Sequence, residues 1–128
     1  MTQVITVTLG NMKFFTRKLI KPADLNARGT LFGGQLLKWI DGEAAIFAFC
    51  QANTQNLVTK AMSEIDFVSP VGEGEIIEFG CELIEFGNSS IKVRCEVRNK
   101  STKKIVITVD EIVFVNVDRW GNVKKIER

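Results

Sequence analysis

The chain has 128 residues, 45% of them apolar, so its length and composition fit one domain with its own core. Seventeen basic and 15 acidic residues give a formal net charge of +2, which provides no bulk electrostatic case for a nucleic-acid partner. The sequence contains no histidine, which excludes Ser-His-Asp and Cys-His catalysis and most catalytic zinc sites. An enzyme built on this chain must use carboxylates, amides, backbone N–H groups, hydroxyls, lysine or thiols.

The sequence has neither a targeting pattern nor a membrane span. Residues 1–10 lack the basic and apolar regions of a secretory signal, and no apolar run approaches the length of a bilayer. Cys50, Cys81 and Cys95 lack metal-ligand spacing, and we interpret them as reduced, buried, intracellular thiols. We therefore expect a cytoplasmic protein without a metal site and with neither a membrane nor a nucleic acid as partner.

The N-terminal quarter predicts one strand followed by a turn. Residues 3–9 alternate loosely and indicate either a strand or a mobile lead-in, whereas residues 13–20 are a better strand candidate that ends before Pro22. The polar residues 23–30 have turn character. We expect a single domain over 1–128, with 1–12 as a lead-in and 122–128 as a polar C-terminal end.

The stretch Gly29–Ala52 predicts a glycine-rich loop that runs into one long helix. Between Leu36 and Cys50 only Lys38, Asp41 and Glu43 are charged. At 100° per residue the helix is apolar nearly all round, as expected for an enclosed helix. The main apolar arc comprises Leu37, Ile40, Ala44, Ala45, Phe47 and Ala48.

Asp41 falls inside this arc, where a carboxylate is costly unless a partner compensates for its desolvation. One interpretation is structural: Asp41 pairs with Lys38 one turn back, or accepts hydrogen bonds from the backbone of a neighbouring element. The other is functional, with Asp41 as a base or nucleophile in a dry cleft.

After the helix the apolar period changes from 3.6 to 2, which predicts strands. They are expected over 57–68, 75–86, 89–99 and 104–118. Short connections favour antiparallel neighbours, so we expect an antiparallel sheet that curls around the helix. One sheet cannot cover a helix that is apolar on almost every side, so we also expect a dimer with the helices near the shared interface.

Several motifs at fixed spacing resemble the acyl-CoA hydrolase branch of the hotdog-fold thioesterases. They are Pro22-Ala23-Asp24-Leu25-Asn26, Gly29-Thr30-Leu31-Phe32-Gly33-Gly34, Leu37-Lys38-Trp39-Ile40-Asp41, and the later Ala61-Met62, Asp66-Phe67 and Phe114–Asp118. The resemblance implies an α+β hotdog fold, with one long central helix wrapped by a curved antiparallel sheet. It also implies hydrolysis of acyl-CoA to the free acid and coenzyme A, with a non-catalytic acyl-CoA-binding module as the alternative.

The resemblance further implies that coenzyme A is part of the substrate and that no separate cofactor is needed. It implies a homodimer as the minimal unit and a homohexamer, a trimer of dimers, as the full assembly.

By the same resemblance, Asp41 is the catalytic carboxylate, as general base or nucleophile, and Asn26 is its companion from the opposite subunit. Phe32 stands where related dehydratases carry a histidine, which favours the hydrolase branch. The N–H groups of Gly33 and Gly34 at the helix start are candidate oxyanion donors. The alternatives are that the two glycines only allow a tight loop and that Asn26 only shapes a turn.

Substrate contacts are expected from hydroxyl and basic side chains. Thr59 and Ser63 share a face of the first strand after the helix, and are either pocket residues or ordinary strand hydroxyls. Arg94 and Arg98, in a row with Lys92, either bind coenzyme A phosphates or form a solvated face. The loop 87–90, with Ser89 and Ser90 as candidate substrate contacts, lacks the basic residue that the resemblance leads us to expect near Asn88. Trp39, Phe47 and Phe49 either line an acyl channel or belong to the core.

Overall fold

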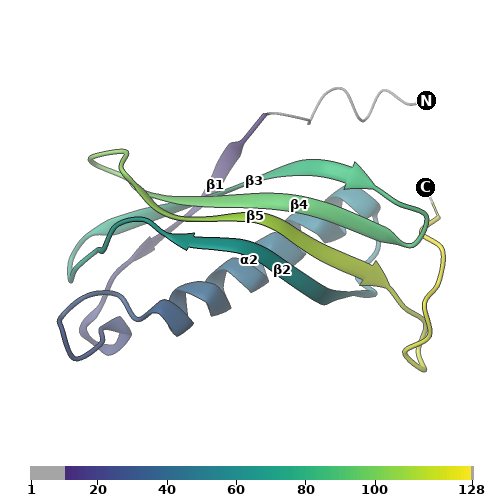
Figure 1. Ribbon diagram of the computed structural model, residues 1–128, viewed down its shortest axis with the longest axis horizontal. Helices are drawn as coiled ribbons and strands as arrows, with labels where there is room; N and C mark the ends of the chain where they lie inside the picture. Colours follow the sequence, from purple (N-terminus) through teal and green to yellow (C-terminus); the bar gives the residue numbers. More distant parts are fainter. Residues whose placement is uncertain (1–10, 128) are drawn as a thin grey trace.

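One 20-residue helix, α2 (Gly33–Ala52), lies against one face of a five-stranded antiparallel sheet (Figure 1). The computed structural model describes residues 11–127. The remaining elements are β1 (Lys13–Leu19), a 3-10 helix η1 (Pro22–Asp24), β2 (Leu57–Phe67), β3 (Ile76–Phe86), β4 (Ser90–Asn99) and β5 (Ile105–Asn116). The hotdog architecture expected from the sequence is confirmed. Strand ends lie within two residues of the expected ones, and the possible strand over 3–9 lies outside the described residues.

The strand order is β1-β3-β4-β5-β2, which corrects one expectation. Short connections favoured pairing between consecutive strands, and the hairpins β3–β4 and β4–β5 follow that rule. Strand β2, however, pairs with β5 rather than with β3. The eight residues 68–75 therefore carry the chain from one side of the sheet to the other, past the first turn of α2.

Helix α2 buries one narrow stripe rather than most of its surface. The fully buried positions repeat every four residues: Leu36, Ile40, Ala44, Ala48 and Ala52. Alanine at three of these positions lets the helix backbone approach the apolar face of the sheet, where residues such as Phe79 and Phe114 are buried. Ile46 is 54% exposed, so the expectation of an enclosed helix is not met within a single chain.

The aromatic residues of α2 pack against the core rather than forming a channel. Trp39 contacts Phe79 edge-on, with ring centroids 6.3 Å apart, and Phe47 stacks on Phe15 of β1 at 6.1 Å. Phe49 also packs against the core cluster. These contacts support the core interpretation of the aromatic side chains.

Two of the three cysteines are buried thiols, as expected, and one is not. Cys81 and Cys95 are direct cross-strand partners on β3 and β4, and their sulfur atoms lie 2.8 Å apart. The hydrogen bond to Cys81, together with burial, raises the pKa of the Cys95 thiol well above its usual value. Cys50 is exposed, so the expectation that all three are buried is wrong for this residue.

Strand β2 is an edge strand whose length is almost entirely uncovered. Only Leu57 at its start is buried, whereas Val58, Ile65 and Phe67 expose 49%, 38% and 54% of their surface. Among the described residues β2 pairs only with β5, so its other backbone edge has no partner strand. A long apolar edge of this kind is a template for pairing with another strand.

Candidate active site

Asp41 lies on α2 beside the start of β2. The hydroxyl of Thr59 donates a 2.7 Å hydrogen bond to Asp41 Oδ1, joining helix and edge strand. Within residues 11–127 the second oxygen, Oδ2, forms no hydrogen bond, and Asp41 forms no ion pair with Lys38. The structure therefore does not support the pairing with Lys38, and one carboxylate oxygen is oriented by Thr59 while the other is left available.

The position of Asp41 on the helix also corrects the sequence-based expectation. Asp41 is half-buried and flanks the stripe that contains Ile40 and Ala44, instead of lying within the buried arc. It thus stands at the margin of the core next to the uncovered edge of β2. This place suits a group that must meet a ligand or a second chain.

Glu43 is a useful comparison because it has the same kind of partner. It is half-buried on α2 and accepts a 2.7 Å hydrogen bond from the Thr16 hydroxyl of β1. Glu43 therefore faces the β1 side of the helix, whereas Asp41 faces the β2 side. The two carboxylates differ chiefly in which edge of the sheet they approach.

Asn26 organises the loop that precedes the helix. Its Oδ1 accepts hydrogen bonds from the backbone N–H groups of Arg28 and Thr30, at 2.9 and 3.1 Å, and its Nδ2 donates to the Thr30 hydroxyl at 3.0 Å. Gly29 within this turn has φ +82°, a conformation that favours glycine. These bonds agree with the turn-forming interpretation of Asn26 and fix its position at the N-terminal end of α2.

A second carboxylate, which the sequence placed only among the residues of the turn, fixes the same loop. Asp24 is buried and accepts hydrogen bonds from the Lys21 N–H, at 2.9 Å, and from the Gln35 amide on α2, at 3.1 Å. The Lys21 bond is the main cause that lowers the pKa of Asp24. The signal in the sequence was a polar residue, Asp24, placed after Pro22 and before the helix, where its side chain can accept local backbone hydrogen bonds.

Gly33 and Gly34 are the first two residues of α2, as expected for candidate oxyanion donors. The residue before them, Phe32, provides no side-chain cap. Among the described residues neither glycine N–H donates to a backbone carbonyl, consistent with the free donors of a helix start. A Cβ at Gly33 would lie 3.3 Å from the Phe67 ring, so any larger residue would require this ring to shift by a few tenths of an ångström.

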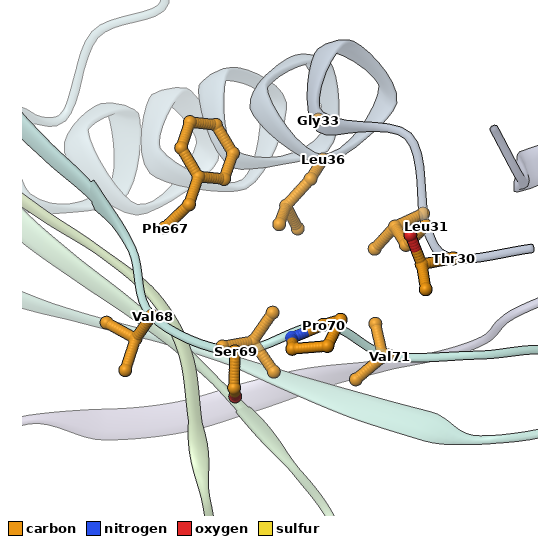
Figure 2. Close-up of a pocket in the computed structure, with 10 residues that line it drawn as sticks. Thr30, Leu31, Gly33, Leu36, Phe67, Val68, Ser69, Pro70 and Val71 are labelled. Atoms are coloured by element: carbon orange, nitrogen blue, oxygen red, sulfur yellow. The ribbon is translucent and has the colours of Figure 1, made fainter. Parts of the chain in front are cut away.

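A pocket of about 270 Å³ opens beside Gly33, between the first turn of α2 and the connection that follows β2 (Figure 2). Most of its walls are apolar and come from three separate segments: Leu31, Leu36, Phe67, Val68, Val71 and Val106. The sequence interpretation missed this pocket. The signal was the run of apolar residues that continues past the end of β2, at Phe67-Val68 and Val71.

One chain does not bring the two halves of the proposed catalytic group together. Asn26 and Gly33 lie at the start of α2, whereas Asp41 follows two turns later, about 12 Å along the helix axis. The residues are therefore arranged as two half-sites on one protomer. The first contains Asp41 and Thr59, and the second contains Asn26, Gly33 and the pocket.

The structure does not assemble the other predicted substrate contacts around Asp41. The β2 register shifts between Thr59 and Ala61, which interrupts the alternation that was expected to place Ser63 on the same face as Thr59. Ser63 is instead opposite the exposed Glu111. Ser89 lies in the β3–β4 turn, and Ser90 is the first residue of β4, where its carbonyl accepts from the Gly87 N–H.

Arg94 and Arg98 lie on the opposite face of the sheet from the helix, alternating with buried residues of β4. Arg94 forms ion pairs with Glu82, Glu96 and Asp110 at 3.0–3.7 Å. The basic row is therefore already paired with acidic side chains of the same face, which favours the alternative in which it does not bind substrate.

Arg98 belongs to a cluster centred on Glu78, a buried carboxylate that was not predicted. Glu78 accepts hydrogen bonds from Arg98 Nε at 2.8 Å, Arg17 Nε at 2.9 Å and Lys103 Nζ at 3.3 Å. The guanidinium of Arg98 also lies 3.7 Å from the ring centroid of Phe14. The bond from Arg98 is the largest of the causes that lower the pKa of Glu78 to about 2.

In residues 11–127 no helix is long and apolar enough to cross a membrane. The same part of the chain holds no group of three metal-ligating side chains.

The sequence profile of a family described as the thioesterase superfamily matches residues 28–106. An uncharacterized acyl-CoA thioester hydrolase of Haemophilus influenzae is 31% identical, over 88% of this chain and 76% of its own length. The solved structure of a hexameric thioesterase from Yersinia pestis matches with a TM-score of 0.86 and 31% identity, covering 94% of this chain and 100% of that one.

A further similar structure is an acyl-CoA hydrolase from Staphylococcus aureus, solved in complex with butyryl coenzyme A, coenzyme A and coenzyme A disulfide. Its TM-score is 0.77 at 29% identity, over 90% of this chain and 68% of that one. Variants of that protein have also been solved in which an aspartate, a threonine or an asparagine is replaced by alanine.

Proposed function

The chain belongs to the thioesterase superfamily, and from this premise we propose that it hydrolyses acyl-CoA thioesters to the free acid and coenzyme A. The observation that carries the proposal is the Asp41 carboxylate, oriented by Thr59 at the margin of the core with one oxygen available. The same three residue types, aspartate, threonine and asparagine, are those replaced in the variants of the Staphylococcus aureus enzyme. Here they correspond in kind to Asp41, Thr59 and Asn26.

In the reaction that we propose, Asp41 works either as a general base or as a nucleophile. As a base, Oδ2 accepts a proton from a water molecule whose oxygen bonds to the acyl carbon. The tetrahedral intermediate then collapses, the carbon–sulfur bond breaks, and the coenzyme A thiolate leaves and takes up a proton. As a nucleophile, the carboxylate displaces the thiolate first and water cleaves the resulting anhydride.

The negative charge that develops on the acyl oxygen needs donors, and the start of α2 supplies them. The N–H groups of Gly33 and Gly34 are free of intrahelical partners, and the positive end of the helix dipole favours negative charge there. Donors fixed before the reaction stabilise an oxyanion without reorganisation. We therefore assign the carbonyl of the substrate to the half-site that contains Gly33.

Two copies of the chain are needed to join this half-site to Asp41. Thr59 lies near the start of β2, and Phe67, which contacts the Gly33 position, ends it. If two β2 edges pair antiparallel about a two-fold axis, the start of one strand lies beside the end of the other. Asp41 of one protomer then approaches the partner's Gly33 and Asn26, and each dimer has two equivalent sites.

We also propose that these dimers assemble into hexamers, as do the thioesterase from Yersinia pestis and other similar structures. The reaction requires no metal and no cofactor beyond the coenzyme A of the substrate. We also propose a cytoplasmic location, because three cysteines without a paired spacing do not suggest a disulfide framework.

The decisive experiment compares Asp41→Asn with Glu43→Gln. Both changes neutralise a half-buried carboxylate of α2 that accepts a 2.7 Å bond from a threonine hydroxyl. Release of free thiol from acyl-CoA substrates should fall by at least ~10²-fold in Asp41→Asn, the scale of a general base, and change little in Glu43→Gln. If a folded wild-type protein binds acyl-CoA without releasing thiol, the chain is a non-catalytic binding module instead.

A further inference from the structure

The pocket beside Gly33 has no side-chain hydrogen-bond donor left to offer a ligand. Its two hydroxyl residues are both used inside the protein: Ser69 donates to the backbone carbonyl of Ile105, and Thr30 is bonded to the Asn26 side chain. The other walls are mainly aliphatic and aromatic (Figure 2). A ligand that entered with amide or phosphate groups would leave those groups unpaired, at a cost in binding free energy.

This chemistry discriminates between the two ends of an acyl-CoA molecule. The coenzyme A end carries amides and phosphates, whereas the acyl end is hydrocarbon. Because the pocket meets the first residue of α2, a carbonyl placed at Gly33 would direct one of its two substituents into the pocket. Only the hydrocarbon substituent matches the walls, so the coenzyme A end must leave in the other direction.

The size of the pocket limits the length of the chain that it covers. An apolar cavity of about 150 Å³ is sufficient to bind benzene, which has six carbons. At 270 Å³ the pocket has room for roughly ten carbons on the same scale. Val71 and Leu36, each 3% exposed, form buried walls of the pocket, whereas Phe67, 54% exposed in the single chain, forms a wall that reaches the surface.

We propose that this pocket binds the acyl chain of the substrate and that Phe67 and Val71 set a preference for short and medium chains. The inference rests on the proposed function and adds to it the substrate class and two specificity-determining residues. Val71 limits the acyl chain at the buried wall, whereas the Phe67 ring narrows the passage beside Gly33.

The test measures kcat/KM for a series of saturated acyl-CoA substrates from acetyl to dodecanoyl. For the wild type, kcat/KM should rise up to about fourfold per added methylene, as expected for burial of hydrocarbon, and stop rising near eight to ten carbons. Val71→Met, which enlarges a buried wall side chain and so reduces the pocket volume, should shift the best substrate about two carbons shorter. Phe67→Ala, which widens the mouth, should shift it to longer chains.

Matched controls separate the pocket from general effects of the same substitutions. Phe15→Ala removes a phenylalanine that is 44% exposed on the opposite edge strand, and Val123→Met enlarges an exposed valine remote from the pocket. Both controls should keep the wild-type profile, and light scattering checks that the assembly is intact in each variant.

The outcomes also separate this inference from the proposed function. Wild-type protein that cleaves none of the substrates contradicts the proposed function itself. Cleavage with a chain-length profile that is flat, or that neither Phe67→Ala nor Val71→Met shifts, overturns the pocket assignment and leaves the hydrolase activity standing. If one of the two variants does not fold, the profile of the other decides.

Discussion

Glu78→Gln is the substitution whose effect on stability follows most directly from the structure. The carboxylate of Glu78 is 5% exposed, and it accepts hydrogen bonds from Arg17, Arg98 and Lys103. These partners lower its pKa from 4.5 to about 2, with the bond from Arg98 as the largest cause. The charged form of Glu78 is therefore stabilised in the folded state.

The magnitude follows from the pKa difference and the exposure of the partners. At 1.36 kcal/mol per pKa unit, a shift from 4.5 to about 2 corresponds to a ceiling of about 3 kcal/mol. The side chains of Arg17 and Lys103 are 61% and 56% exposed, so solvent screens part of this energy. We expect Glu78→Gln to lower the free energy of unfolding by about 1–2 kcal/mol at pH 7.

The pH dependence has a definite sign. The unfolded chain takes up a proton at Glu78 near pH 4.5, whereas the folded chain resists protonation until about pH 2. The stabilisation is therefore complete above pH 4.5 and is lost as the pH falls from 4.5 toward 2. The difference between wild type and variant should be largest at pH 7 and clearly smaller at pH 3.

Urea unfolding at fixed protein concentration, at pH 7, 4 and 3, measures these differences. Glu85→Gln is the control, because Glu85 lies on the same strand and its side chain is 61% exposed. Its Oε1 lies 3.6 Å from Lys92 Nζ, a longer contact than those of Glu78. Glu85→Gln should lower the free energy of unfolding by less than about 0.5 kcal/mol at every pH. A Glu78→Gln effect that is absent at pH 7, or equal at pH 7 and pH 3, would refute the reasoning.

Four further results are expected. Thr59→Val should lower kcat about tenfold or more, whereas Thr59→Ser, which keeps the hydroxyl, should stay within about threefold of wild type. Mixing inactive Asn26→Ala and Asp41→Ala subunits should restore part of the turnover. The shared-site arrangement is wrong if fully exchanged mixtures stay inactive while wild-type subunits taken through the same exchange remain active. Arg98→Gln should lower the melting temperature yet leave KM for acyl-CoA within about twofold; a tenfold rise would instead place Arg98 in the substrate site. Light scattering at micromolar concentration should detect no active species near the 14.3 kDa chain mass, and such a species would contradict the dimeric site.

The sequence predicted the elements well because periodicity records which side chains are buried. On β4 the alternation of Ile91, Val93, Cys95 and Val97 with charged residues corresponds to the observed burial at every position. Periodicity does not record which strand lies next to which, so it could not place β2 beside β5. That pairing depends on tertiary packing across the face of the sheet.

The candidate site was predictable in part for a similar reason. Asp41 stood out in the sequence because a charge is unusual in an apolar helix. Its position beside the buried stripe of α2 became visible only in the structure. Arg98 was named as a candidate substrate contact, and its pairing with Glu78 was not recognisable because Glu78 lies 20 positions earlier, on a different strand. The pocket beside Gly33 is composed of residues from separate segments, such as Leu36 and Val106, which no local pattern connects.

Because β2 is an edge strand that pairs with β5, its place in the sheet is fixed late in folding. Among the described strands β2 pairs only with β5, and Leu57 at its start joins Asn116 near the end of the chain. During synthesis α2 and β2 therefore emerge long before the strand that holds β2 in place. Pairings that close such long loops form slowly, whereas the β3–β4 hairpin needs only local contacts. Although Asp41 and Thr59 are only 18 positions apart, their contact becomes fixed only when β5 has docked. A substitution that delays the docking of β5 should thus slow the appearance of activity during refolding, even if it lies far from Asp41.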